Sequence, residues 1–272
     1  MKLFVVSDVH GFYKEFREAL DAAGFDPENE EHWLISCGDN WDRGDYPWEV
    51  MHYLRNLPRK VLVRGNHEDL FEECIKQGYP DYHDYTNGTV GTIEKLGHTE
   101  DGKDFYECCI TADARTKAFL DSMVNYFETK NYIFCHSWIP TICNDGLPAW
   151  YRKGADGRPR DRKFDPEWRY AHQSDWYGAR WVNPLEMAMR GLCPDKTIVS
   201  GHWHCGTGWN YQKRCDGETD IPNDYELSGL GPYNYENKLI MLDACTAYTK
   251  KVNVLVLEDN FITEEDNVNV DA

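Results

Sequence analysis

The chain has 272 residues, of which 41% are hydrophobic and 28% charged, and its formal net charge at pH 7 is -18. A chain of this length and apolar content can bury a full core. The excess of acids argues against general nucleic-acid binding, which needs a basic face, and no apolar run is long enough for a membrane-spanning helix.

The first predicted strand, Leu3 to Val6, begins so close to the N-terminus that no signal peptide precedes it, and we therefore expect a cytoplasmic protein. Asp8 and His10 follow this strand. Alternate residues of an extended chain lie on one side, so a carboxylate and an imidazole can reach one cation there. Taken alone, this pair is more often a turn than a site. The apolar stripe of residues Phe12 to Ala23 then predicts a helix that ends at Gly24, which completes a strand-loop-helix unit.

The second predicted strand, Trp33 to Cys37, leads into the stretch CGDNWDRG. Gly38 ends the strand, so Asp39 emerges at its carboxyl end, where ligands of open α/β sheets collect. Asp42 and Arg43 add a second acid and a guanidinium. A carboxylate can bridge two cations, and a guanidinium can clamp a phosphate with two parallel hydrogen bonds. This stretch alone is equally compatible with a surface Asp-Arg pair in a turn.

A predicted helix, Pro47 to Leu57, precedes the third strand, Val61 to Arg64, which ends in GNHE. Asn66 offers a neutral carbonyl oxygen, which suits a metal already surrounded by carboxylates. His67 is its neighbour, and neighbours on a turn cannot easily bind the same metal. We therefore predict that His67 transfers protons, with Asp42 holding its imidazole in one tautomer and raising its pKa.

The stretch from Asp69 to Tyr126 predicts mixed helix and loop, with short helices at Phe71 to Ile75 and at Phe119 to Phe127. The glycosylation pattern at Asn87 is interpreted as a turn, because no secretory signal precedes it. The ten cysteines are scattered without a CxxC pair, so we expect buried thiols and no disulfides.

The fourth predicted strand, Tyr132 to Cys135, ends in His136, and the fifth, Thr197 to Ser200, leads into GHWH with His202 and His204. Five apolar strands thus each end in a residue of the metal-ligand type. Five of the ten histidines lie at these ends. Structural histidines scattered through a core would not be distributed in this way.

In this order, DVH, GDNWDRG, GNHE, the strand-terminal His136 and GHWH resemble the five blocks of the calcineurin-like metallophosphoesterases. The second and third blocks resemble the branch of the Ser/Thr phosphoprotein phosphatases and symmetrical diadenosine tetraphosphatases. The resemblance covers Asp8 to His204. It implies an α/β fold in which two mixed β-sheets pack face to face between flanking helices, as a four-layer sandwich. Two later predicted strands, Leu239 to Leu242 and Val252 to Glu258, fit the end of such a core.

The resemblance also implies two divalent metal ions. The implied ligands are Asp8, His10 and Asp39 for one metal, and Asp39, Asn66, His136 and His202 for the other. Oxygen and nitrogen ligands without thiolate suit manganese, iron or zinc, and manganese is our first choice. His67, paired with Asp42, resembles the general acid of the family, and Arg43 resembles a phosphate clamp.

Two further residues come from the same resemblance. The branch usually has a second phosphate-binding arginine on a Trp-containing segment, and the segment Asp175 to Trp181 predicts Arg180 in this role. His204 departs from the branch, because its protein phosphatases generally show one histidine in the last block. Phosphodiesterase-type relatives show GHxH, in which the second histidine joins the first metal, so His204 is a further candidate ligand.

We expect one metallophosphoesterase domain over residues 1–258, with an irregular insertion at about 140–175 and a frayed acidic tail at 259–272. From Trp150 to Trp181, eight Lys or Arg stand against five acids. This local excess predicts a lid that attracts an anionic substrate, and the alternative is a loop with solvated charges.

Three functions are compatible with these features. The first is a phosphomonoesterase of the Ser/Thr protein phosphatase type, which acts on a phosphorylated protein or a small phosphoester through a metal-activated hydroxide. The second is a phosphodiesterase or diadenosine polyphosphate hydrolase, supported by His204 and by aromatic residues that could stack a base. The third is a non-catalytic binding scaffold, which would normally lack at least one ligand, whereas none is missing. No feature of the sequence indicates an oligomeric state.

Overall fold

Two mixed β-sheets form the centre of the computed structural model, which describes residues 1–97, 104–143 and 162–262. The first sheet has the order β11-β1-β2-β3, and its strands are β1 (Lys2–Val6), β2 (His32–Ser36), β3 (Lys60–Leu62) and β11 (Leu255–Glu258). The second has the order β4-β5-β8-β10-β9, with β4 (Tyr126–Glu128), β5 (Tyr132–Cys135), β8 (Thr197–Ser200), β9 (Tyr233–Tyr235) and β10 (Leu239–Met241). The inner strands of each sheet are parallel, and the edge strands β11, β4 and β9 are antiparallel to their neighbours.

The sheets pack face to face through their buried side chains. In β1, Leu3 and Val5 point toward the second sheet and join a cluster with Phe134 and Val199. Phe4 and Val6 of β1 point the opposite way, into a cluster formed with helices. A strand that is buried on both faces needs apolar residues at every position, which explains the continuous apolar run of β1.

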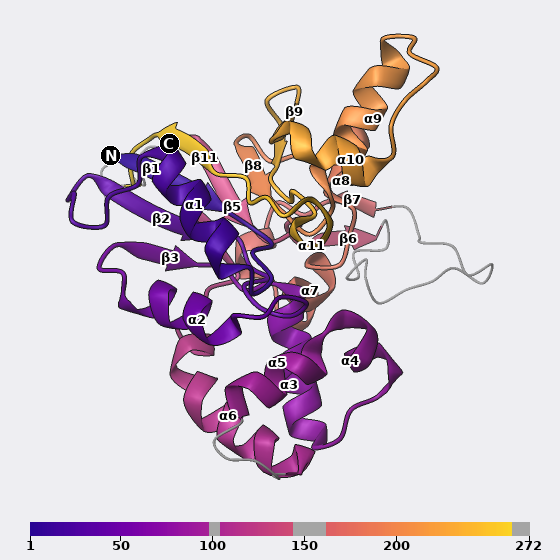
Figure 1. Cartoon of the computed structure of the whole chain (residues 1–272). Coiled ribbons are helices and arrows are strands. Elements are labelled where there is room, and N and C mark those ends of the chain that lie inside the picture. The colour runs from indigo at the N-terminus through magenta and orange to yellow at the C-terminus, as the bar shows by residue number, and fades with distance from the viewer. Residues whose placement is uncertain (98–103, 144–161, 263–272) are drawn as a thin grey trace.

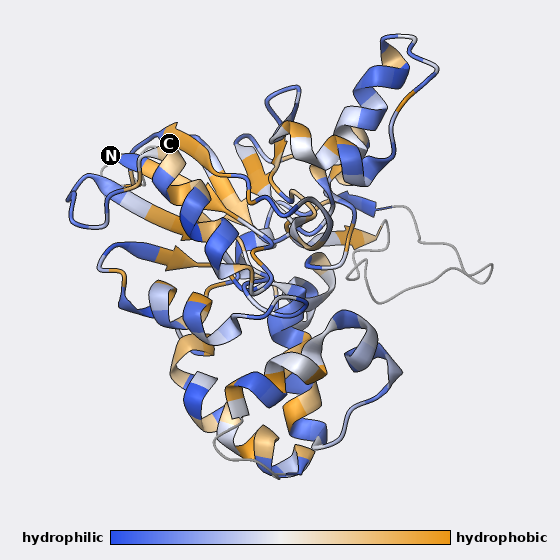
Figure 2. Ribbon diagram, in the orientation of Figure 1, coloured by the Kyte–Doolittle hydropathy of each residue, from blue (hydrophilic) through white to orange (hydrophobic). Residues whose placement is uncertain are grey.

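Helices cover both outer faces (Figure 1). On the side of the first sheet the helices are α1 (Tyr13–Ala23), α2 (Pro47–Asn56), α3 (Asn66–Gln77), α5 (Thr89–Gly97) and α6 (Phe105–Leu120). Helix α4 (Tyr82–Asn87) packs on α5, away from the strands. On the second sheet they include α7 (Gln173–Ala179), α8 (Pro184–Met189) and α9 (Cys205–Cys215). The short helix α10 (Asp224–Leu227) packs on α9 and on α11 (Thr246–Thr249). Apolar residues gather in the strands and on the inner sides of the helices (Figure 2). The predicted α/β sandwich is therefore confirmed.

Two smaller expectations about this architecture also have an outcome. No disulfide is present among the described residues, and most of the cysteines are buried. None of the described helices is both long and apolar enough to cross a membrane.

The helix predicted at Phe119 to Phe127 is wrong. Helix α6 ends at Leu120, and Tyr126–Glu128 form β4, which pairs antiparallel with β5. Tyr126 packs on Trp168 and Trp176, with ring centroids 4.8 and 5.1 Å away, whereas Phe127 faces the cluster between the sheets. This alternation between two faces is the period of a strand.

The insertion and the tail are more ordered than predicted where the structure describes them. A two-stranded ribbon, β6 (Thr141–Cys143) with β7 (Arg162–Phe164), and a 3-10 turn, η2 (Trp168–Tyr170), lie within the stretch expected to be irregular. Asp259 accepts hydrogen bonds from Thr129 and Asn131, so the chain does not fray at residue 259. Residues 144–161 of the predicted insertion, which include part of the predicted lid, and the end of the tail, 263–272, lie outside the described residues.

Candidate metal centre

The predicted ligands converge at one edge of the two sheets because they follow parallel strands. Asp8 and His10 follow β1, Asp39 follows β2, Asn66 begins α3 after β3, His136 follows β5, and His202 follows β8. The first five are at most 2% exposed. Parallel strands present their carboxyl ends at the same edge, so residues far apart in the sequence meet there.

Asp39 lies at the centre of this cluster. Its Oδ2 atom is 3.8 Å from Nε2 of His10 and 3.9 Å from Nε2 of His67, and its Oδ1 is 3.3 Å from Nε2 of His136. Asp39 thus belongs to two groups of possible ligands, one with His10 and His67 and one with His136 and His202. Within each group the ligand atoms lie within 4.8 Å of one another. A carboxylate shared in this way can bridge two neighbouring cations.

Asn66 and Asp8 lie beside the two groups of possible ligands, Asn66 beside His136 and His202, and Asp8 beside His10. The Oδ1 atom of Asn66 is 2.7 Å from Nε2 of His136 and 2.9 Å from Nδ1 of His202. On the other side, an oxygen of Asp8 is 3.9 Å from Nε2 of His10, and the backbone N–H of His202 donates to both Asp8 oxygens. This set of carboxylate, amide and imidazole atoms fits divalent cations such as manganese, iron and zinc.

The electrostatics of the cluster also fit a cation. Burial and the nearby charges of Asp243 and Asp39 raise the pKa of Asp8 well above its ordinary value. Burial, with repulsion from Arg43, lowers the pKa of His10, so this imidazole is neutral and able to bind a metal. Burial alone would lower the pKa of His136, but attraction to Asp39 raises it to about 9. The positive charge of protonated His136 balances the negative charge of Asp39, and a bound cation would balance the same charge.

The backbone at the cluster is strained. Six candidate site residues have positive φ angles: Asp8 (54°), His10 (49°), Asp39 (56°), Asp42 (71°), Arg43 (65°) and His202 (64°). Residues other than glycine avoid this region unless the surrounding structure holds them there. Glycine is required beside them for a different reason, because a Cβ atom on Gly65 would collide with Asp39 and one on Gly201 would collide with Asp8. Strain and close backbone approach of this kind are typical of functional sites.

This strain predicts a difference between two substitutions at Arg43. We expect Arg43→Gly to have a free energy of unfolding about 1 kcal/mol higher than Arg43→Ala, because a left-handed conformation costs an L-residue about 1–2 kcal/mol. Urea denaturation in metal-free buffer measures the difference. The matched control is Arg17 in α1, where glycine should be the less stable replacement. A less stable glycine variant at residue 43 would contradict the prediction.

His67 and Asp42 are in direct contact. Nδ1 of His67 lies 2.6 Å from Oδ2 of Asp42, which also accepts a hydrogen bond from Thr89. Nε2 of His67 therefore faces the cluster and accepts from Arg43 at 3.0 Å. The other terminal nitrogen of Arg43 donates to His10 at 2.6 Å. The structure thus places a guanidinium and an imidazole beside Asp39, and their roles in proton transfer and phosphate binding stay predictions.

Arg180 does not point into the cluster. Its guanidinium donates three hydrogen bonds, two to Asp69 at 2.6 and 3.1 Å and one to Asn125 at 3.1 Å. The next residue, Trp181, does reach the cluster, because its ring centroid is 6.0 Å from that of His202. A phosphate contact through the Nε–Nη2 edge of Arg180 would require this arginine to leave Asp69.

His204 lies outside both groups of possible ligands. Its Nε2 atom is 3.7 Å from a carboxylate oxygen of Asp243, and its ring packs on Tyr225 with the centroids 5.2 Å apart. Asp243 follows β10 and is buried. Sequence analysis did not place Asp243 at the site, although it follows an apolar strand as the other acids do.

Glu68 is a second residue whose importance the sequence analysis missed. Its Oε2 accepts from the backbone N–H of Gly65 at 2.8 Å and of Asp39 at 3.0 Å, and its Oε1 accepts from Asn40. One buried carboxylate therefore fixes the end of β2 against the start of α3. The signal was present, because Glu68 is the last residue of GNHE.

We expect Glu68→Gln to destabilise the protein by about 1–3 kcal/mol, because an amide NH₂ cannot accept the hydrogen bonds of two of these donors. Metal affinity or activity should fall by about 10- to 100-fold, as for other residues that orient ligands. Thermal unfolding and metal titration measure both effects. Glu72→Gln is a matched control on the next turn of α3, because Glu72 pairs with Arg64 and Lys76 outside the cluster. Equal effects of the two substitutions would contradict the orienting role.

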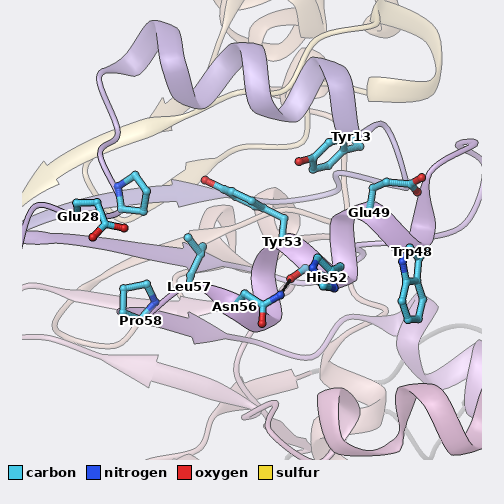
Figure 3. A pocket seen from close by; sticks show the side chains of 10 residues that line it. Tyr13, Glu28, Trp48, Glu49, His52, Tyr53, Asn56, Leu57 and Pro58 are labelled. Carbon is cyan, nitrogen blue, oxygen red and sulfur yellow. Dashed lines mark hydrogen bonds between the residues drawn. The ribbon is translucent and has the colours of Figure 1, made fainter.

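Two cavities differ in their relation to the cluster. One of about 550 Å³ lies beside it and is lined by Trp181, Trp203, Arg162 and Arg190, among others. Another, of about 350 Å³, lies between α1 and α2 (Figure 3). None of the predicted site residues lines this second cavity.

Comparison with known proteins agrees with this geometry. Residues 1–206 match the family described as calcineurin-like phosphoesterase. The chain is similar to a symmetrical bis(5'-nucleosyl)-tetraphosphatase of Aromatoleum aromaticum, with 38% identity over 69 residues, which are 25% of this chain and 24% of that protein. It is also similar to serine/threonine-protein phosphatase 2 of Escherichia coli, with 38% identity over 76 residues, or 28% of this chain and 34% of that protein. The matched segment thus spans only about a quarter to a third of the length of these curated relatives.

A solved structure of a cold-active protein tyrosine phosphatase matches 94% of this chain and 73% of its own, with a TM-score of 0.52 and 18% identity. At this identity the likeness is one of fold. The family match covers more than half of the chain and includes all five strand ends that carry the cluster. The chain therefore belongs to the calcineurin-like phosphoesterases, a family of hydrolases that act on phosphoester bonds.

Proposed function

We propose that the chain is a phosphoester hydrolase with a dinuclear metal centre, and that it acts as a phosphomonoesterase of the Ser/Thr protein phosphatase type. The observation that carries the proposal is the position of Asp39, which is shared by two groups of possible ligands. Arg43 and His67 stand beside it as a phosphate-binding and a proton-transferring group.

The residues that would hold the metals are those of the two sides of the cluster: Asp8, His10 and Asp39, and Asp39, Asn66, His136 and His202. When bound, two divalent cations would polarise the phosphoryl oxygens and lower the pKa of water. Manganese is our first choice, with iron and zinc as alternatives. We retain the expected cytoplasmic location as part of this proposal.

Arg43 and His67 would act together. Arg43 now donates to Nε2 atoms of two histidines, and the oxygens of a phosphate are stronger acceptors for the same fork. When Arg43 turns to phosphate, Nε2 of His67 becomes free to carry a proton. Asp42 stabilises the resulting imidazolium through Nδ1, and His67 can then protonate the departing oxygen.

A second candidate function is hydrolysis of dinucleoside polyphosphates. The cavity beside His202 favours it, because Trp181 and Trp203 offer partly exposed aromatic rings, at 36% and 39% exposure. Arg162 and Arg190 line the same cavity and carry positive charge. Aromatic rings stack on nucleobases, and guanidinium groups bind phosphates. One of the similar relatives is named for the hydrolysis of a bis(5'-nucleosyl) tetraphosphate.

A substrate panel tests the proposal. The chain would be assayed with manganese, iron or zinc against phosphoserine and phosphothreonine peptides, p-nitrophenyl phosphate, its bis-ester, and diadenosine tetraphosphate. We expect the monoesters to have the highest kcat/KM. Preference for diadenosine tetraphosphate or the bis-ester would favour the second candidate, and metal binding without turnover of any substrate would favour a non-catalytic scaffold.

Trp203→Ala separates the two candidates further. If the cavity holds a nucleobase, KM for diadenosine tetraphosphate should rise about 5- to 150-fold, because stacking on an aromatic side chain contributes about 1–3 kcal/mol per base. KM for p-nitrophenyl phosphate should stay the same. Trp48→Ala is the matched control, because Trp48 is exposed to a similar extent, at 43%, but lines the cavity between α1 and α2. An unchanged KM for both substrates would remove the second candidate.

A further inference from the structure

Two arginines share one buried carboxylate beside the metal centre. Asp69 receives Nε and Nη2 of Arg180 at 2.6 and 3.1 Å, and Nε of Arg64 at 2.6 Å. Asp69 and Arg180 are 5% and 4% exposed. A buried guanidinium with two parallel bonds to a carboxylate is a strong and geometrically specific contact.

The same fork is the part of an arginine that binds phosphate. A carboxylate and a phosphate both present two oxygens to it at a similar spacing, so one site on the guanidinium cannot serve both. Asp69 occupies the Nε–Nη2 edge of Arg180, so a phosphate can bind through this edge only by exchanging the oxygens of Asp69. By contrast, Arg43 contacts imidazoles, and among the described residues no carboxylate lies within ion-pair distance of it.

Both members of the pair are near residues of the cluster along the chain. Asp69 lies in α3, two residues after His67, and Trp181 directly follows Arg180 and packs on His202. Asp69, Arg180 and Asn125 also line a cavity of about 1070 Å³, so the pair borders open space although both side chains are buried.

We propose that Asp69 is a specificity-determining residue, which competes with the phosphate of the substrate for Arg180. The inference rests on the proposed function, in which phosphate binds beside Arg43. A monoester carries two negative charges and a diester one, so a second available guanidinium would favour the monoester. Asp69 neutralises that guanidinium and thereby reduces the difference in kcat/KM between the monoester and the diester.

Binding of inorganic phosphate tests the inference without relying on turnover. Titration calorimetry would compare the manganese-loaded wild type with Asp69→Asn, Arg180→Ala and the double variant. We expect Asp69→Asn to bind phosphate about tenfold more tightly or better, because the freed guanidinium can donate charge-assisted hydrogen bonds to phosphate. The gain should vanish in the double variant, because the proposed competition for phosphate takes place at Arg180.

Glu72→Gln is the matched control, because Glu72 also pairs with Arg64 but has no contact with Arg180. It should leave phosphate affinity unchanged. A tighter binding that persists without Arg180, or an unchanged affinity in folded Asp69→Asn, would overturn the inference. If Asp69→Asn does not fold, variants of the two arginines test the inference. Arg180→Ala should weaken phosphate binding less than threefold, and Arg43→Ala should weaken it about tenfold or more. Equal losses of phosphate affinity in the two variants would overturn the competition.

The kinetic readout is the ratio of kcat/KM for p-nitrophenyl phosphate to that for its bis-ester. We expect this ratio to rise about tenfold in Asp69→Asn and to stay constant in Glu72→Gln. A ratio that does not move in Asp69→Asn would contradict a role in specificity. If no variant hydrolyses either ester, the proposed function fails, whereas the phosphate titration still decides whether Asp69 competes for Arg180.

Discussion

Asp39→Asn is expected to reduce kcat/KM by at least about 10³-fold and to remove most of the bound metal. Asp39 is the one residue that belongs to both groups of possible ligands, at 3.3 Å from His136 and 3.8 Å from His10. An amide keeps the shape of the side chain but loses its charge and one acceptor oxygen, so it cannot bridge two cations. The expected loss corresponds to several kcal/mol of transition-state stabilisation, which is the scale of metal-ion catalysis.

Elemental analysis and thermal unfolding with and without manganese measure this effect. Metal that binds only the folded state should stabilise the wild type by about 2.7 kcal/mol at 100 times its Kd, and should stabilise the variant much less. His202→Ala, which removes a ligand from one group, should lose less metal than Asp39→Asn. Asp45→Asn is the matched control, because the side chain of Asp45 is 82% exposed and pairs with Lys95. Full metal occupancy in Asp39→Asn would contradict the dinuclear centre.

His67→Asn should lower kcat by about 10²- to 10⁴-fold for substrates with poor leaving groups, the usual scale for loss of a general acid. The loss should shrink for p-nitrophenyl phosphate, because nitrophenolate leaves without a proton. Asp42→Asn should show the same dependence with a smaller loss, since it removes the acceptor that orients Nδ1 of His67 at 2.6 Å.

Metal content distinguishes this role from ligation. Nε2 of His67 lies within the first group of possible ligands, so a lost metal would also reduce kcat. We expect metal content to be unchanged in His67→Asn. His52→Asn is the control, because His52 lies on α2 at the cavity of Figure 3 and touches no residue of the cluster. An equal loss of kcat for every leaving group, together with loss of metal, would assign His67 as a ligand.

The strand ends that carry the cluster could be predicted from the sequence for a physical reason. Central strands buried on both faces have continuous apolar sequences, and a polar residue one or two positions after such a run lies near the carboxyl end of the strand. Asp8, Asp39 and His136 are all of this kind. Asn66 was expected to lie in a turn, whereas it is the first residue of α3.

Sequence patterns could not predict the short edge strand β4 or the hydrogen-bond partners of long side chains. Tyr126–Glu128 is three residues long, so its period cannot be separated from that of a helix. The partners of Glu68 are backbone N–H groups of another strand end, and nothing in the local sequence names them.

The sequence by itself determined which strands carry candidate ligands, in their order along the chain, the residue types at the strand ends, and the family that the chain resembles. These are local properties, because burial sets the apolar runs and turn chemistry sets the residues at their ends. Only the tertiary structure decided that Arg180 bonds to Asp69, 111 residues away in the chain, and that His204 lies beside Asp243 and outside both ligand groups. A long charged side chain takes the best partner that the folded neighbourhood offers, and that neighbourhood is assembled from distant segments.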